Sequence, residues 1–529
     1  MKHIFKLKYA LSLALLCITF SCDDVLVNED PNGVVIDELQ PEVILPGAFT
    51  VPSATLMTTM NDLGNTMIAT WSGNAQQVQA PYFTEFQYQL STDFYSGIWD
   101  NLMARTGNLT QIIVNDYSSN YDYFKGASKI YRAFYFQYLV DLYGDIPFTD
   151  IHQRGDLLFP EYDNQVNVYI ALINDVNDAI DQIQNTDANT AVDMGSNDVI
   201  MGGNMNMWIK FGNTLKLRML LRISDVAPSN PDLQTVLNTE FASLNNAEFI
   251  GFGENVTINP GYSDEVDRMN PFAETFGYAA GEFGNTANET FSNLRAGPTT
   301  FLVEFLNGST NGVADSRLQR LYAPRAGQAA IQGNTQGGGD QPSRIGPGLL
   351  SSPQQDGYIM TASESLFLQS EAVFKGLLSS GNAKGLFESA ILSSFIRLGV
   401  DTDDVYPLGH PLEGELNPET TPELAANAYI NASSNVNKIG WDGSTDKLEA
   451  IITQKWIDLG GTNGAETWIE YTRTGYPSNM PLPDITNRPN RPLRLLYPTS
   501  EYTGNSANVS VYNQTVDTAF DLPVFWDVD

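Results

Sequence analysis

The chain has 529 residues and a net charge of −34, and 42% of its residues are hydrophobic. This length and composition are typical of a globular protein that buries a large core. The strong acidic balance argues against nucleic acid as a ligand, since phosphate binding needs clustered Lys and Arg.

The first 21 residues have the parts of an export signal. An apolar run at 11–20, too short to span a bilayer, follows a positive segment that carries Lys2, Lys6 and Lys8. The run ends in Ile-Thr-Phe-Ser-Cys, which resembles the lipobox of bacterial lipoproteins. We therefore expect residues 1–21 to be a signal peptide and Cys22 to be acylated. Cys22 would then be the single cysteine left, which excludes internal disulfides and Cys-based metal cages.

Residues 22–46 are acidic and interrupted by proline, which predicts an extended tether between the lipid and the body. Residues 47–529 are expected to form one domain. The acidic pair Asp23 and Asp24 directly follows the expected lipid cysteine. Such a pair resembles a surface-export signal in some double-membrane bacteria and an inner-membrane retention signal in others.

Beyond the tether, apolar residues recur with the 3.6-residue period of amphipathic helices. The predicted helices are 96–116, 124–143, 165–184, 205–224, 362–378, 382–398 and 444–460. They form two helical blocks, at about 96–225 and 362–475. The segments at about 50–95, 226–361 and 401–443 are expected to be loop-rich, most clearly the Gly- and amide-rich stretch 327–348. After 476 we expect irregular structure with a few short strands.

Four phrases in the helical blocks resemble the SusD/RagB family of nutrient-binding outer-membrane lipoproteins. They are DLYGDIPF at 141–148, WIKFGNTLKLR at 208–218, ESLFLQSEAVFKG at 364–376, and QKWI at 454–457 followed by ETWIEYTRTGYP at 466–477. Their order and spacing span nearly the whole chain. The closest likeness is to the subgroup with Trp-x-Lys-Phe and Arg-Thr-Gly-Tyr-Pro phrases.

The resemblance implies a mainly α fold. Tetratricopeptide-like helix pairs would form the scaffold, with long irregular loops and a few short strands on the ligand side. It also implies a cell-surface position on the outer membrane and a TonB-dependent β-barrel transporter as partner. We expect the motif residues Trp208, Trp456 and Trp468 to lie in the core, and Arg218 and Arg473 to pair with scaffold carboxylates.

Sugar binding needs flat aromatic faces beside amides, carboxylates and Arg side chains. Residues 71–99 interleave aromatic and amide side chains in a predicted loop. An exposed platform would include Trp71, Asn74, Gln76, Tyr82 and Phe86, and the alternative is that these rings pack on the scaffold.

A second set of candidate ligand residues lies beside polar or Gly-rich loops and comprises Tyr262, Arg344 and Trp441. The resemblance makes an oligosaccharide or polysaccharide the first expectation for the ligand. A peptide or glycopeptide in the same role is an alternative.

An enzyme is not expected. After cleavage the two histidines, His152 and His410, have no metal-ligand spacing, and no nucleophile elbow or phosphate loop is present. A glycoside hydrolase needs only two suitably placed carboxylates, so it stays as a lesser alternative. No catalytic residue, metal ligand or cofactor is predicted. The run at Asp401, Asp403 and Asp404 lacks the Gly and Glu of an EF-hand loop, which favours a solvated turn and leaves structural calcium open.

Overall fold

The computed structural model describes residues 39–77, 80–117, 119–153, 157–286, 289–401 and 420–528. Contacts divide the chain into an N-terminal unit, Met1–Gln40, and a body, Pro41–Asp529. The expected signal peptide and Cys22 lie outside the described residues, as do His410, Asp403 and Asp404.

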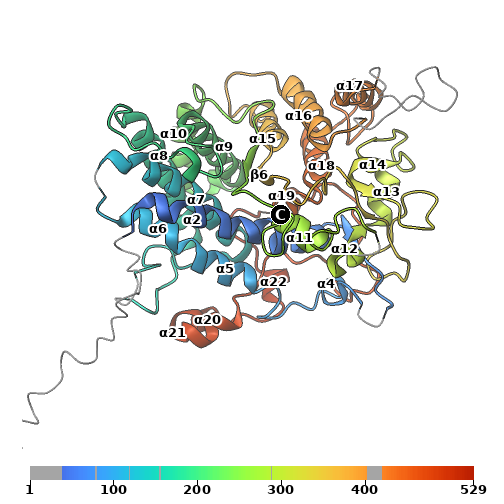
Figure 1. Ribbon diagram of the computed structural model, residues 1–529, viewed down its shortest axis with the longest axis horizontal. Coiled ribbons are helices and arrows are strands. Elements are labelled where there is room, and N and C mark those ends of the chain that lie inside the picture. Colours follow the sequence, from blue (N-terminus) through green and yellow to red (C-terminus); the bar gives the residue numbers. More distant parts are fainter. Residues whose placement is uncertain are drawn as a thin grey trace, which may run out of the picture. The chain divides into compact units, whose positions relative to one another are not determined.

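The body is mainly helical (Figure 1), and its described residues form three small two-stranded sheets. Its longer helices are α2 (Pro41–Thr55), α3 (Asn61–Met67), α5 (Gly97–Arg105), α6 (Gly107–Val114), α7 (Asp122–Tyr143), α8 (Gln165–Asn185), α9 (Met205–Ile223), α10 (Pro231–Leu244), α13 (Thr300–Leu306), α15 (Ala362–Phe374), α16 (Ala383–Leu398), α17 (Pro422–Ser433), α18 (Lys447–Leu459) and α19 (Gly464–Thr474). Its shorter helices are α4 (Phe83–Phe86), α11 (Pro271–Phe276), α12 (Phe291–Arg295), α14 (Leu318–Leu321), α20 (Thr499–Gly504), α21 (Ser506–Val509) and α22 (Thr518–Asp521), with a π-helix η2 (Leu56–Met60) and the 3-10 turns η3 (Ser119–Tyr121), η4 (Gly195–Asn197), η5 (Ala227–Ser229) and η6 (Ser510–Tyr512).

The strands pair antiparallel across long sequence separations. β1 (Trp71–Ser72) pairs with β3 (Gly297–Pro298), β2 (Val256–Ile258) with β6 (Gly357–Met360), and β4 (Tyr322–Ala323) with β5 (Arg344–Ile345). All six strands lie within the segments expected to be loop-rich, 50–95 and 226–361, so the pairings tie these segments to one another.

Helix pairs form the scaffold. The most extensive contacts join α7 to α8 and α15 to α16, and further contacts join α8 to α9, α9 to α15 and α18 to α19. In Figure 1 helix α9 lies next to α15, with α8 and α10 to the left of α9 and α16 and α18 to the right of α15. This arrangement confirms the expected mainly α fold, and the seven predicted helices all exist. The prediction at 96–116 is split into α5 and α6 at Thr106.

The loop expected from residue 50 was wrong over 50–67, because α2, η2 and α3 run through it. The tether also ends earlier than expected, since α2 begins at Pro41. Helices α10, α13 and α17 likewise occupy parts of the expected loops 226–361 and 401–443. The stretch Pro41–Met67 is long and apolar enough to cross a membrane by length and composition. Its side chains at Leu45, Phe49 and Leu56 are fully buried in the body, as expected for a core helix.

A buried ion network joins four of the scaffold helices. On α9, Arg222 contacts Glu466 of α19 at 2.7 Å and Asp141 of α7 at 3.0 Å, and Arg218 contacts Glu364 of α15 at 3.1 Å. All five side chains are fully buried. Removing one partner from such a network leaves an uncompensated buried charge, so the network fixes how the helices pack.

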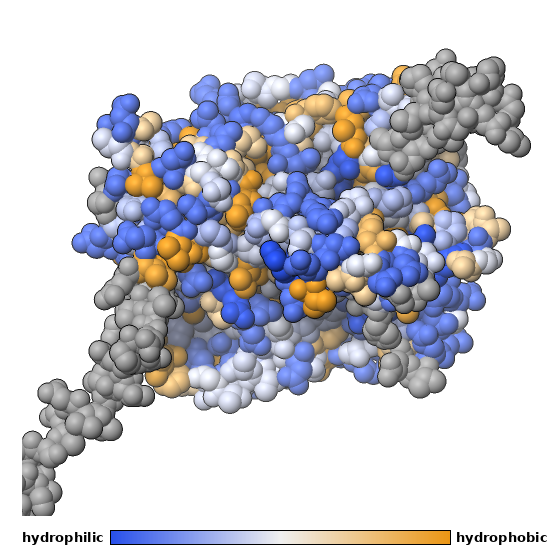
Figure 2. Space-filling model, in the orientation of Figure 1, coloured by the Kyte–Doolittle hydropathy of each residue, from blue (hydrophilic) through white to orange (hydrophobic). Residues whose placement is uncertain are grey.

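The motif residues take the structural places that we expected. Arg473 pairs with Glu371 at 2.8 Å, and Arg218 pairs with Glu364. The three motif tryptophans are at most 3% exposed, and they are Trp208, Trp456 and Trp468. Figure 2 shows that the face in view is mostly hydrophilic, with hydrophobic residues in small groups.

Candidate functional site

The expected aromatic platform is not exposed. Trp71 and Phe86 are fully buried and Tyr82 is 2% exposed. Trp71 lies in β1 opposite Pro298, and its ring packs edge-on against Phe276 with centroids 5.0 Å apart. Pairing of β1 with β3 places the Trp71 ring inside the body. All three rings are buried, so the alternative, packing on the scaffold, holds for them.

Tyr82 belongs to a buried polar cluster. Its hydroxyl donates to Oδ1 of Asp62 at 2.7 Å, and Arg295 lies over its ring at 4.3 Å. Burial raises the pKa of Asp62, although the ion pair with Arg295 at 3.0 Å opposes the rise. The Tyr82 hydroxyl and ring are therefore both engaged by other side chains of the protein and are poorly available to a ligand.

The other predicted ligand residues do not form one site. Asn74 accepts the backbone N–H of Gln76 at 3.0 Å in a surface turn, where Gln76 is exposed. Arg344 donates to the hydroxyl of Tyr278 at 2.9 Å and pairs with Glu289. The Trp441 ring packs on Phe387 with ring centroids 5.6 Å apart. Trp441 is also distant in sequence from the other candidate ligand residues. Ligand contact by these residues stays a prediction.

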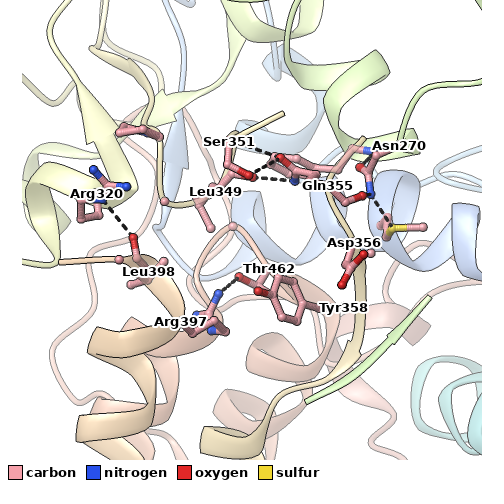
Figure 3. Close-up of a pocket in the computed structure, with 17 residues that line it drawn as sticks. Asn270, Arg320, Leu349, Ser351, Gln355, Asp356, Tyr358, Arg397, Leu398 and Thr462 are labelled. Carbon is pink, nitrogen blue, oxygen red and sulfur yellow. Dashed lines mark hydrogen bonds between the residues drawn. The ribbon is translucent and has the colours of Figure 1, made fainter. Parts of the chain in front are cut away.

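A cavity of about 310 Å³ lies where the loops meet the scaffold (Figure 3). Its volume is at the small end of the range for ligand pockets. It is bounded by η2, the start of α11, the end of α16, β6 and the turn between α18 and α19. Its lining includes the side chains of Met57, Arg320, Asp356, Tyr358, Arg397 and Thr462.

Arg397 is the most firmly held of these groups. Its side chain is 1% exposed, and it donates to the Thr462 hydroxyl at 3.1 Å and to Oδ1 of Asp458 at 3.0 Å. Its guanidinium lies over the Tyr358 ring at 5.4 Å. Asp458 itself is fully buried and accepts a hydrogen bond from Ser363 at 2.6 Å. The Arg397 guanidinium therefore lies in the cavity wall with its charge balanced by Asp458 and its orientation fixed by hydrogen bonds.

Tyr358 gives the cavity an aromatic wall and a free hydroxyl. It lies in β6 and is half-buried, and its hydroxyl makes no hydrogen bond within the described part of the chain. The neighbouring Gly357 allows this close packing, because a Cβ there would lie 2.3 Å from the sulfur of Met57. Met57 belongs to the π-helix η2, a local irregularity often found at functional sites.

The opposite rim carries Asp356, on the right of Figure 3. Asn259 donates to its Oδ1 at 2.8 Å, and the Asn259 side chain in turn accepts the backbone N–H of Tyr262 at 3.0 Å. Burial raises the pKa of Tyr262, with a further contribution from Asp356. Of the residues predicted from sequence, Tyr262 thus lies beside this rim.

The arrangement can bind a hydroxyl-rich ligand. Its described lining combines an aromatic wall with two Arg side chains, three hydroxyls and one carboxylate. Asp356 is the single carboxylate among the described residues that line it, so the cavity lacks the carboxylate pair that glycoside hydrolysis uses. Tyr358, Arg397 and Arg320 were not predicted from the sequence, because no local motif marks them.

Comparisons with known proteins agree with this architecture. The SusD-like family model, described as "Starch-binding associating with outer membrane", matches residues 41–498. A chitin-binding SusD homologue from Flavobacterium johnsoniae is 21% identical, with a TM-score of 0.70 over 92% of this chain and 99% of its own. A chitin-binding protein is 22% identical, with a TM-score of 0.68 over 93% and 100%.

A SusD/RagB family protein from Bacteroides thetaiotaomicron is 18% identical, with a TM-score of 0.69 over 92% of this chain and 99% of its own. At these identities the structural likeness establishes the fold. Among curated proteins, none matches the chain.

Proposed function

Because the chain belongs to the SusD-like family, we propose that it binds a glycan in the Arg397–Tyr358 cavity at the cell surface and delivers it to a TonB-dependent transporter. The observation that carries the proposal is the stacked pair of Arg397 and Tyr358. An aromatic face packs on the apolar side of a sugar ring, while fixed donors satisfy its hydroxyls.

A neutral ligand suits this cavity. The charge of Arg397 is compensated by Asp458, and Arg320 and Asp356 bring one charge of each sign. Neutral glycans satisfy such a surface without an unpaired charge. The described chitin-binding homologue makes chitin oligosaccharides a natural probe, and the family description adds starch oligosaccharides. Binding of a peptide in the same role is the second candidate.

The position at the membrane rests on the N-terminus. Acylation of Cys22 would tether the protein to the outer membrane, which agrees with the description of the family. We place the body at the external face, where it would hold the ligand over the mouth of a β-barrel transporter.

The test is calorimetric titration of the purified protein with chitin and starch oligosaccharides. We expect saturable binding without shortened products. Tyr358→Ala should weaken binding about tenfold, the equivalent of about 1.4 kcal/mol for a lost aromatic contact. Phe159→Ala is the matched control, because this ring is 57% exposed on a different segment. Binding of neither series, or equal affinity of wild type and Tyr358→Ala, would contradict the proposal.

A further inference from the structure

A second cavity is lined in part by residues that are close in sequence to residues of the first cavity. Its volume is about 690 Å³, and it lies between α13 and the loop 325–341. Its lining includes the polar side chains Glu304, Arg325, Gln328, Gln332 and Asp340. The loop overlaps the Gly- and amide-rich stretch 327–348 that the sequence predicted to be loop-rich.

The β4–β5 ribbon connects the two cavities. Before β4 the chain contributes Arg320 to the first cavity, and after β4 it contributes Arg325 to the second. β5 runs the other way, from Gln341 in the second cavity to Pro347 in the first. Arg325 follows Arg320 by five positions in the chain, so their Cα atoms are at most roughly 18 Å apart.

Hydrogen bonds hold both ends of the ribbon. At the first cavity the N–H of Gly348 donates to the Arg320 carbonyl at 2.7 Å. At the second, Nε of Arg325 donates to the Pro342 carbonyl at 2.9 Å, and the Gln328 amide donates to the Gln341 carbonyl at 3.0 Å. The separation of the two cavities is therefore fixed by a paired element and does not depend on an independent loop.

The second cavity offers hydrogen-bonding groups that the protein itself does not use. Within the described part of the chain, the side chains of Glu304, Gln332 and Asp340 make no hydrogen bond or ion pair. Arg325 is different, because Glu289 at 2.6 Å and the Asn293 carbonyl at 2.7 Å hold it in the wall. The free groups are mainly acceptors, whereas Arg320, Arg397 and Thr462 present donors in the first cavity.

We propose that the second cavity is a further glycan subsite, and that the ligand is an oligosaccharide long enough to reach it across the β4–β5 ribbon from the Arg397–Tyr358 cavity. This inference rests on the proposed function, with sugar hydroxyls donating to Glu304, Asp340 and Gln332. Among the described residues, no aromatic ring lines the second cavity. This cavity would therefore add affinity for an oligosaccharide that Tyr358 already holds in the first cavity. Joining two subsites through one ligand raises affinity by effective concentration.

The test measures how affinity depends on oligosaccharide length, using oligomers of two to six units from the chitin or starch series that binds. The wild type should bind the six-unit oligomer at least tenfold more tightly than the two-unit oligomer. The double variant Glu304→Ala/Asp340→Ala should lose most of this gain and keep the affinity for the two-unit oligomer. The control Asp181→Ala/Glu248→Ala removes two acidic side chains from a separate groove between α8 and α10 and should behave as wild type.

Four outcomes overturn the inference. An unchanged length dependence in the Glu304/Asp340 variant would show that this cavity takes no sugar unit. Equal weakening of all lengths would show that the two residues act through the first cavity. A wild type that binds short and long oligomers equally would exclude a second subsite while leaving the proposed function intact. Binding of no oligomer at all would contradict the proposed function and this extension together.

Discussion

Glu364 should make the stability of the scaffold depend on pH near neutrality. Its carboxyl is fully buried, with Oε1 against Arg218 at 3.1 Å and no partner for Oε2 in the described part of the chain. Burial, reinforced by the nearby Glu466, raises its pKa from 4.5 to about 7, although Arg218 and Lys455 oppose the rise. The folded protein therefore binds a proton that the unfolded chain has released.

The direction and size of this pH dependence of the free energy of unfolding follow from proton linkage. Between pH 4.5 and about 7 the folded state holds more protons than the unfolded state at this site, so the free energy of unfolding falls as pH rises. The full contribution is present below pH 4.5 and is lost as the pH passes 7. A rise of the pKa from 4.5 to about 7 corresponds to about 3 kcal/mol.

Neighbouring carboxylates act in a different window. Burial opposes ionisation of Glu470, but Arg473, Lys455 and Arg222 together lower its pKa. The stability that Glu470 contributes is present at neutral pH and is lost as the pH falls below 4.5. A measurement restricted to pH 5–8.5 therefore isolates Glu364 from Glu470.

The assay is urea unfolding of wild type and Glu364→Gln across pH 5–8.5 at fixed salt. The amide cannot titrate, so the variant should lose the decline of about 3 kcal/mol toward high pH. The control is Glu248→Gln, whose side chain is 80% exposed and should leave the profile unchanged. A wild-type profile identical in slope to that of Glu364→Gln would refute the reasoning.

Two further predictions concern packing and the anchor. Gly64→Ala should lower the free energy of unfolding by about 3 kcal/mol, because its Cβ would lie 1.9 Å from the Gly464 backbone where α3 crosses α19. Gly47→Ala in α2, with no atom within 4 Å of its Cβ, should instead gain about 0.5–1 kcal/mol, and an unfolding titration that finds equal effects would contradict the close approach. Cys22→Ala should abolish labelling by radioactive palmitate and move the protein from the membrane to the soluble fraction; continued labelling would exclude Cys22 as the acylated residue.

The sequence predicted helices well where one face is polar. The segment 165–184 carries an apolar stripe opposite Asp and Asn residues, and α8 occupies Gln165–Asn185. The same method missed α2, η2 and α3 for a physical reason. These helices are largely buried and have no continuous polar face, so they show no amphipathic period, and Pro46 and Pro52 lie inside α2.

The candidate site could not be found by local patterns. Tyr358, Arg397 and Thr462 lie on β6, on α16 and in the turn before α19, and no short motif links these positions. Trp71 and Tyr82 were selected because aromatic and amide residues alternate around them. The pairing of β1 with β3, more than 200 residues apart, decides that Trp71 is inside. Composition predicted aromatic and amide side chains as ligand contacts, but tertiary contacts decide which aromatic side chains line a cavity and which lie in the core.

The scaffold also explains why the cavity is pre-organised. At the start of α15, Ser363 and Thr361 donate to Oδ2 of Asp458 on α18, at 2.6 and 3.3 Å. The other oxygen of Asp458 holds Arg397, which stacks on Tyr358. The same helix α15 carries Glu364 and Glu371 into the buried ion network. Because the side chains of the proposed binding cavity are oriented by the elements that stabilise the fold, little order would have to be gained on ligand binding, which favours affinity.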